Sequence, residues 1–250
     1  MGHPGYNVSY WFHYRQHGGP EMQHTNGDTL VTQIKKTPVM QQVKKAVWGL
    51  RKKVLVARGG APSGWYDDVY SHGHEDYVNH YSESRYLPVW EALCERIAPG
   101  SSVLEIGCGP GQLAEMMLDK GVGSYVGFDF SPTAIELARK RLPNCRLEVA
   151  DARTTDLYTS EKFDVVVATE VLEHIIDDLP VLERVPRGAI ILATVPNFDY
   201  ASHVRFFGTV EQVRERYGPL FESLEVATHF HAGDPDGSHG IFYLLHGRRA

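Results

Sequence analysis

With 250 residues, 42% of them hydrophobic, the chain is long enough for one large folded domain or for a domain with an appendage. The formal net charge of −6 argues against a chain that binds nucleic acid over its whole surface, and no apolar run of about 18 residues predicts a transmembrane helix. The first twenty residues lack the apolar run of a secretory signal, and three widely spaced cysteines form no disulfide framework, so we expect a cytoplasmic protein with reduced thiols.

Residues 1–64 are predicted to form an N-terminal extension. Residues 1–28 show no hydrophobic period, which indicates an irregular segment. Residues 39–56 place apolar side chains on one helical face with lysines around them, which predicts a helix. Residues 35–58, which include this predicted helix, are strongly basic and contain no acidic residue. That composition suits a solvated helix docked on the acidic core or on a second copy of the chain, a helix on a membrane surface, or a nucleic-acid contact.

Residues 65–100 are predicted to be helical and to lead into the core, with a helix over Tyr86–Ile97 that ends at Pro99. Aromatic side chains recur before and at the start of this helix: Trp65, Tyr66, Tyr70, Tyr77, Tyr81 and Tyr86. Three histidines in the same stretch have loose spacing and no neighbouring cysteine, so they do not predict a metal site: His72, His74 and His80.

Residues 101–250 alternate between strand and helix patterns. The predicted strands are Ser102–Ile106, Ser124–Asp129, Cys145–Ala150, Phe163–Ala168, Ala189–Thr194, Phe221–Thr228 and Gly240–Leu245, and the predicted helices are Gly111–Lys120, Pro132–Arg141 and Glu211–Tyr217. Continuous apolar runs suit strands that are covered on both faces, which predicts a doubly wound α/β fold with a mostly parallel sheet. Turn residues at 233–237 separate the last two strands and predict a C-terminal antiparallel hairpin.

The most informative segment is the run Val103–Gly111, an apolar strand that leads through a glycine-rich turn into a helix. Glycines allow a sharp turn and a close approach of a ligand to the backbone. The third glycine is Gly111, whereas a dinucleotide fingerprint would place it at position 112, which is Gln112; this disfavours an NAD-dependent oxidoreductase. Glu105, two residues before the glycines, suits a ligand that carries a positive charge, such as a sulfonium.

The run Glu105–Gly111 resembles the first motif of class I S-adenosylmethionine-dependent methyltransferases, which have a seven-stranded Rossmann-like sheet. Three later stretches resemble motifs of the same family in the same order: Gly127–Asp129, Val149–Ala152 and Phe163–His174. The match covers about two-thirds of the chain, from residue 85 on. We therefore expect residues 101–250 to be an S-adenosylmethionine-binding methyltransferase core.

The resemblance implies S-adenosylmethionine as the cofactor, with Asp129 as the ligand of the ribose hydroxyls and Asp151 as the partner of the adenine amino group. The residues expected to contact the cofactor are Glu105, Gly107, Cys108, Gly109, Gly111, Asp129, Phe130, Asp151, Ala152 and Glu170. The resemblance also implies that residues 65–100 form a lid over cofactor and acceptor.

His174, just after the fourth predicted strand of the core, is the expected general base, since histidine titrates near neutrality. The expected reaction is methyl transfer to an oxygen or nitrogen of a small-molecule acceptor such as a sugar or a secondary metabolite, by analogy with the fold.

Two alternatives remain open. Four residues resemble the metal-binding set of small-RNA 2′-O-methyltransferases: Glu170, Glu173, His174 and His203. The first three would share one helical face, but the acidic net charge argues against RNA, so we assign no metal ligand. The second alternative is a non-catalytic module that binds the cofactor, which the intact Glu105, Asp129 and Asp151 disfavour.

Overall fold

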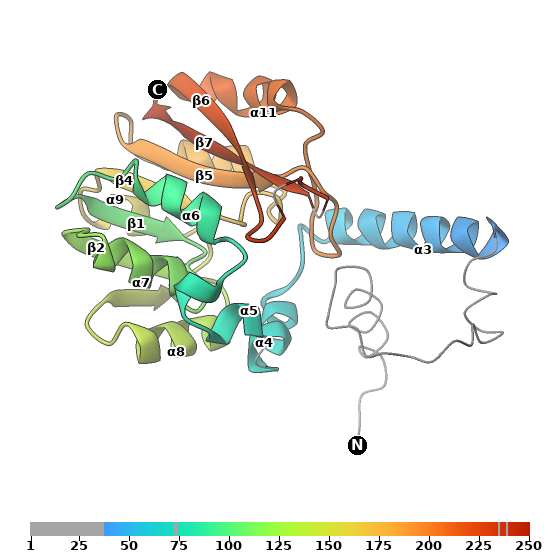
Figure 1. Cartoon of the computed structure of the whole chain (residues 1–250), viewed down its shortest axis with the longest axis horizontal. Helices are drawn as coiled ribbons and strands as arrows, with labels where there is room; N and C mark the ends of the chain where they lie inside the picture. Colours follow the sequence, from blue (N-terminus) through green and yellow to red (C-terminus); the bar gives the residue numbers. More distant parts are fainter. Residues whose placement is uncertain (1–37, 73–74, 235, 239) are drawn as a thin grey trace. The chain divides into compact units, whose positions relative to one another are not determined.

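The computed structural model describes residues 38–72, 75–234, 236–238 and 240–250 (Figure 1). The predictions for residues 1–28 and for His74 lie outside these residues. The chain divides into two units between Arg51 and Lys52. The predicted basic helix is confirmed as α3 (Pro38–Ala57). In the part of the chain that is described, no helix has both the length and the apolar character needed to cross a membrane.

One mixed sheet forms the centre of the second unit, with strand order β3-β2-β1-β4-β5-β7-β6 (Figure 1). The strands are β1 (Ser102–Ile106), β2 (Ser124–Asp129), β3 (Arg146–Val149), β4 (Val165–Ala168), β5 (Ile190–Pro196), β6 (Phe221–Phe230) and β7 (Ile241–Arg249). The first five strands are parallel, and β7 pairs antiparallel with both β5 and β6. The predicted seven-stranded, doubly wound fold with a C-terminal antiparallel hairpin is confirmed.

Helices cover both faces of this sheet, and two hydrophobic clusters fill the layers between them. One layer contains side chains of α6 (Leu87–Cys94), α7 (Gln112–Asp119) and α8 (Pro132–Arg141). The other contains side chains of α9 (Leu157–Ser160), α10 (Asp178–Glu183) and α11 (Val210–Tyr217). Because both faces are covered, every residue of β4 is buried, as its continuous apolar run predicts.

Short helices precede the core: α4 (Ser63–Ser71), α5 (Glu75–Val78) and the 3₁₀ turn η1 (Tyr81–Glu83). α4 packs against α8, and Figure 1 shows α4 and α5 beside the carboxyl ends of β1 and β2. Side-chain contacts fix α4 there, because Asp67 accepts hydrogen bonds from Ser131 Oγ at 2.5 Å and from the backbone N–H of Thr133 at 3.2 Å.

The expected helix after β4 is absent, and the expectation that Glu170, Glu173 and His174 share a helical face is wrong. Residues 169–177 form bends and turns up to α10. Among the described non-glycine residues, Glu170 alone has a positive φ, +55°. A left-handed residue at this point prevents a right-handed helix from starting directly at the end of β4.

β7 also runs further than its sequence predicts, to Arg249. Its last residues are polar or small and have low strand propensity. They are strand because β5 and β6 lie on either side of β7 and supply backbone partners to both of its edges.

Candidate active site

The carboxyl ends of β1, β2, β3 and β4 lie along one edge of the sheet, because these strands are parallel. The predicted site residues follow these strand ends directly, so the fold gathers them at this edge. They fall into two groups, a glycine-loop half around residues 105–111, 129–131 and 151–153, and a second half formed by residues 170–176 and 197–205.

The glycine loop is held in a left-handed conformation. Gly107, Gly109 and Gly111 have φ values of +67°, +51° and +84°. A Cβ added at Gly107 would lie 2.4 Å from Cγ2 of Val171, so the loop packs directly against the turn that follows β4. The two halves of the site therefore meet at Gly107.

The carboxylate of Asp129 holds this loop in place through hydrogen bonds. Its Oδ2 accepts a hydrogen bond from the backbone N–H of Gly109 at 3.0 Å, and its Oδ1 accepts one from the N–H of Ser131 at 2.9 Å. The carboxyl group thereby ties the glycine loop to the start of α8. Burial raises the pKa of Asp129 to about 6, although these backbone donors favour the ionised form.

Glu105 lies inside the sheet with 1% of its surface exposed. The Tyr125 hydroxyl donates to Glu105 Oε2 at 2.6 Å, and Gly127 leaves room for that hydroxyl, since a Cβ there would lie 2.3 Å from it. Burial raises the pKa of Glu105 to about 8. At neutral pH this carboxyl group is largely protonated, so it presents a hydrogen-bonding group rather than the negative charge that its position in the sequence suggests.

Asp151, after β3, pairs with Arg153 in a two-pronged contact, at 2.7 Å between Nη2 and Oδ2 and at 3.0 Å between Nε and Oδ1. This hydrogen bonding lowers the pKa of Asp151. Arg153 was not among the predicted site residues. A basic residue two positions after Asp151 is a local sequence signal that could have identified it. Ala152 is buried, and its carbonyl accepts from the Tyr158 hydroxyl at 3.0 Å.

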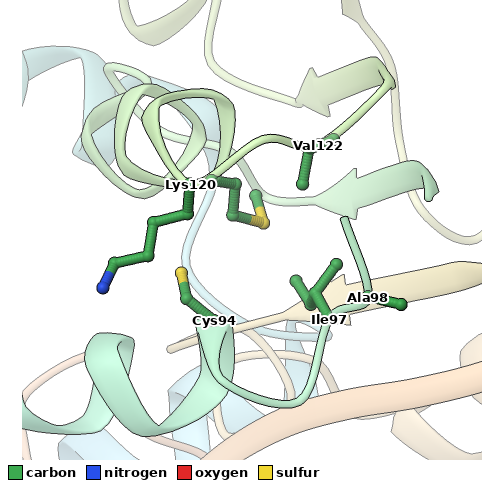
Figure 2. Close-up of a pocket in the computed structure, with 6 residues that line it drawn as sticks. Cys94, Ile97, Ala98, Lys120 and Val122 are labelled. Atoms are coloured by element: carbon green, nitrogen blue, oxygen red, sulfur yellow. The ribbon is translucent and has the colours of Figure 1, made fainter. Parts of the chain in front are cut away.

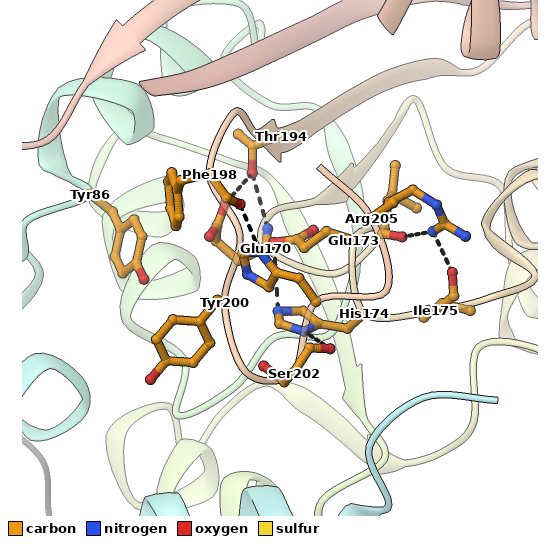
Figure 3. A network of polar contacts seen from close by, with 12 residues as sticks. Tyr86, Glu170, Glu173, His174, Ile175, Thr194, Phe198, Tyr200, Ser202 and Arg205 are labelled. Atoms are coloured by element: carbon orange, nitrogen blue, oxygen red, sulfur yellow. Dashed lines mark hydrogen bonds and ion pairs between the residues drawn. The ribbon is translucent and has the colours of Figure 1, made fainter. Parts of the chain in front are cut away.

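The second half of the site contains two interacting carboxyl groups, those of the half-buried Glu170 and the buried Glu173 (Figure 3). The backbone N–H of Glu170 donates to Thr194 Oγ1 at 3.0 Å, and that hydroxyl donates to Glu170 Oε1 at 3.1 Å. Glu173 is fully buried, and neither of its carboxylate oxygens has a hydrogen-bond partner among the described residues. Burial raises the pKa of Glu170 to about 7; burial and the nearby Glu170 raise the pKa of Glu173 well above its ordinary value.

Two histidines lie beside Glu173. His174 Nδ1 is 3.2 Å from the backbone oxygen of Ser202, and its Nε2 is 3.6 Å from Glu173 Oε1 (Figure 3). His203 Nδ1 is 3.1 Å from the backbone oxygen of Phe198. Burial lowers the pKa of His174 to about 4, so its ring is neutral at neutral pH. The two rings contact each other with centroids 4.9 Å apart.

Tyr66 of α4 lies between the two halves. Its ring is edge-on to Phe130, at 5.1 Å between centroids, and edge-on to His174, at 5.8 Å. Tyr66 therefore contacts one predicted site residue of each half.

Comparison with known proteins agrees with this geometry. Residues 103–187 match the model of a family described as a methyltransferase domain. A chain in the complex between the Haloferax volcanii Trm112 methyltransferase activator and its methyltransferase superposes with a TM-score of 0.55, at 18% identity, over 75% of this chain and 96% of that one. Residues 103–187 therefore match a methyltransferase domain, and the seven-stranded sheet has the fold of a solved methyltransferase.

Two curated relatives extend the match in sequence. The ribosomal protein L11 methyltransferase of Desulforapulum autotrophicum is 36% identical over 107 residues, which are 40% of this chain and 35% of that protein. The ubiquinone biosynthesis O-methyltransferase of Neisseria meningitidis serogroup C is 32% identical over 145 residues, 56% of each chain. The chain therefore spans about a third of the first relative and about half of the second.

Arg205 holds the turn after β4. Its guanidinium donates to the backbone oxygens of Leu172, Ile175 and Ile176, the last at 2.8 Å, and lies 3.2 Å from Asp178. Sequence reasoning missed Arg205, because its partners are carbonyl groups 29–33 residues earlier and backbone groups leave no sequence signal.

Lys52 has a similar role for the loop after β5. Its Nζ donates to the backbone oxygens of Tyr200, at 2.6 Å, and His203, and pairs with Asp199. From the sequence, Lys52 was predicted only to belong to the basic segment 35–58.

A small pocket between α6 and α7 lies at the opposite, amino-terminal edge of β1 and β2 (Figure 2). Cys94, Ile97, Lys120 and Val122 are among the residues that line it. Burial raises the pKa of the Cys94 thiol to about 12, which leaves it unreactive. None of the predicted site residues lines this pocket.

Proposed function

We propose that the chain is an S-adenosylmethionine-dependent methyltransferase that acts on an oxygen or nitrogen of a small-molecule acceptor. One observation carries the proposal: within the matched domain, the Gly107–Gly111 loop, which Asp129 anchors, packs at Gly107 directly against Val171 of the Glu170–His174 turn. A cofactor on the loop and an acceptor at the turn are then neighbours. Alignment of two reactants in this way is worth about 7–11 kcal/mol in favourable cases.

On this proposal, Asp129 binds the ribose hydroxyls and Asp151 faces the adenine amino group. The backbone of the glycine loop, with Phe130 and Ala152, forms the rest of the cofactor contact. Glu105 and Glu170 lie at the ends of β1 and β4, where the sulfonium end of the cofactor would meet the acceptor.

The side chains near Glu170 support a small acceptor with a planar or apolar part. Phe198 contacts His203 and His231, and Tyr86 contacts His231 and Phe242. Aromatic surfaces with a few convergent polar groups are typical of small-molecule sites. The name of the Neisseria relative states O-methylation, which favours an oxygen acceptor such as a phenolic or sugar hydroxyl.

His174 is the residue that we propose as the general base. It is neutral at neutral pH, and its Nδ1 faces a carbonyl oxygen, which leaves the lone pair on Nε2. A base in this position contributes roughly 10²- to 10⁴-fold to the rate when the acceptor is a hydroxyl.

Two experiments on the full chain test the proposal. Titration calorimetry with S-adenosylhomocysteine is expected to show one site per chain, and a methyl-release assay against pooled phenols, sugars and amines is expected to show turnover. Asp68→Ala, a change to an exposed aspartate of α4, is the control for Asp129→Ala. No binding of the cofactor product would overturn the proposal, and binding without turnover on any acceptor would favour the non-catalytic module.

A further inference from the structure

Exposed apolar surface is concentrated on α3. Among the described residues, ten large hydrophobic side chains are exposed, and six of them belong to this helix. Because an α-helix turns by about 100° per residue, apolar residues spaced three or four positions apart lie along one face. Five of the six have this spacing and form what we call the apolar stripe, each with 44–70% of its surface exposed: Val39, Val43, Val47, Leu50 and Val54. A single exposed apolar side chain is ordinary, whereas a continuous patch indicates an interaction surface.

Basic residues border the apolar stripe. α3 contains five lysine and arginine residues and no acidic residue. Arg51 and Lys53, which are both exposed, lie about 80° to either side of the middle of the stripe. This face of the helix therefore offers apolar contact along its centre and positive charge along both edges. That combination is typical of a helix that lies in the plane of an anionic membrane surface.

The opposite face of the last helical turns already has a partner. Lys52 donates from Nζ to the backbone oxygen of Tyr200 at 2.6 Å and pairs with Asp199, so this face contacts the loop after β5. Val54 is two positions later and therefore lies about 200° further round the helix, on the side away from that contact. Docking on the core, one of the roles expected for the basic segment 35–58, thus uses Lys52 and leaves the apolar stripe exposed.

We propose that the apolar stripe of α3 and its basic edges bind an anionic lipid surface, with the helix axis parallel to that surface. The residue types favour lipid over the other occupants. Two stripes packed together would bring the basic edges of two copies into repulsion. A groove on a partner protein is usually anchored by large aromatic side chains, and the half-buried Trp48 lies off the stripe. Nucleic acid would use the basic residues but would leave the valines in water.

This inference goes beyond the proposed function and is independent of it, since no residue of the apolar stripe belongs to the candidate active site. It concerns where the chain binds and not which reaction it catalyses. The two proposals can therefore fail separately.

Binding is measured by sedimentation of the full chain with vesicles. Vesicles of an equimolar mixture of phosphatidylcholine and phosphatidylserine are compared with vesicles of phosphatidylcholine alone. We expect the chain to bind the mixed vesicles, with binding to the neutral vesicles weaker by at least about tenfold. Added salt is expected to weaken binding to the mixed vesicles, because it screens the attraction between the basic edges and the lipid charge.

Two matched variants locate the contact on the helix. Val47→Glu places a charge in the middle of the apolar stripe and is expected to weaken binding to the mixed vesicles at least about tenfold. Val56→Glu makes the same change at another exposed valine of α3, about 140° from the middle of the stripe. It is expected to change the affinity by less than about threefold, because its charge lies on the far side of the helix and is screened.

The outcomes are distinct. The proposal is overturned if the wild-type chain does not bind the mixed vesicles, or if Val47→Glu and Val56→Glu bind them equally well. Without vesicle binding, a dimer that Val47→Glu converts to a monomer in sedimentation velocity assigns the stripe to a second copy, and binding to duplex DNA that Val47→Glu leaves unchanged assigns the basic residues to nucleic acid. Circular dichroism and S-adenosylhomocysteine binding are expected to be the same in both variants as in wild type, so failure of the vesicle experiment leaves the proposed function untouched.

Discussion

The two halves of the sheet edge differ in how their polar groups are satisfied. In the glycine-loop half, each carboxyl group has a partner: Asp129 accepts from two backbone N–H groups, Asp151 pairs with Arg153, and Glu105 accepts from Tyr125. In the second half, Glu173 has no hydrogen-bond partner among the described residues and Glu170 has a left-handed backbone. Buried polar groups without partners and strained backbone conformations occur mainly where a protein binds or reacts, because the rest of the fold must compensate for their unfavourable free energy. The comparison supports the proposal that the preformed half holds the cofactor and that the strained half acts on the acceptor.

The largest expected effect comes from the contact that joins the halves. Gly107→Ala places a side chain on a residue with left-handed backbone and against Val171. We therefore expect the free energy of unfolding to fall by about 3 kcal/mol, from backbone strain and overpacking together. Urea unfolding measures this loss, and calorimetry with S-adenosylhomocysteine is expected to show weakened binding.

Gly188→Ala is the matched control for Gly107→Ala, because it has a positive φ of +85° but nothing within 4 Å of an added Cβ. The difference between the two variants isolates the clash. Adding Val171→Ala to Gly107→Ala is expected to recover part of the loss. Equal losses for Gly107→Ala and Gly188→Ala would show that the two halves are not tightly packed.

Arg205→Met is expected to loosen the second half alone. The change leaves three carbonyl oxygens of the turn without their donor, at a cost of about 2–3 kcal/mol in the free energy of unfolding. Hydrogen exchange at residues 171–176 is expected to accelerate, while the affinity for S-adenosylhomocysteine stays within about threefold because Arg205 contacts nothing in the glycine-loop half.

Arg216→Met is the control, since Arg216 binds the same Asp178, at 2.5 Å, but none of these carbonyl groups. If it accelerates exchange in the turn as much as Arg205→Met does, the ion pair and not the carbonyl contacts holds the turn. A large loss of cofactor-product binding in Arg205→Met would contradict the independence of the halves.

The same division separates what the sequence predicted from what it did not. The bounds of β1 and β2 were predicted to the residue, because an apolar run ends at a glycine or a charged residue in each. The glycine loop and Asp129 are local signals, within a few positions of a strand end. The turn at Glu170 is not local: a left-handed conformation at a non-glycine residue has no reliable sequence pattern, and the expected helix was wrong.

Long-range backbone contacts explain most of the remainder. Lys52 binds carbonyl groups 148 and 151 residues later in the chain, and no side-chain pattern encodes such a partner. The grouping of Glu173 and His174 with His203 also depends on the loop after β5 folding back beside β4. The resemblance named all three residues, but only the structure shows which of them meet.

Asp129→Ala is expected to act on the glycine-loop half alone. Loss of a charged acceptor for the ribose hydroxyls is expected to weaken S-adenosylhomocysteine binding by about 1.5–3 kcal/mol, with Asp68→Ala unchanged. Unchanged affinity for the cofactor product would remove Asp129 from the site.

The smallest expected effect is a pH dependence of cofactor-product binding. Burial raises the pKa of Asp129 to about 6, so the carboxyl group is mostly protonated at pH 5 and mostly ionised at pH 7. The ionised form is the better acceptor for a ribose hydroxyl, and we expect the affinity for S-adenosylhomocysteine to rise by up to about tenfold over this range. Asp129→Asn does not titrate and is expected to bind with a flat profile.

The stability of the unliganded chain is expected to change in the opposite sense. The folded-state pKa of Asp129 lies above the ordinary value of 3.8, so the folded chain holds this proton more tightly than the unfolded chain does. The contribution of Asp129 is therefore fully present below about pH 4 and is lost as the pH rises through about 6. Urea unfolding of wild type against Asp129→Asn isolates this contribution. A wild-type affinity that falls between pH 5 and 7, or the same rise in Asp129→Asn, would assign the titration to another group and leave the glycine-loop half without its ionised ribose ligand.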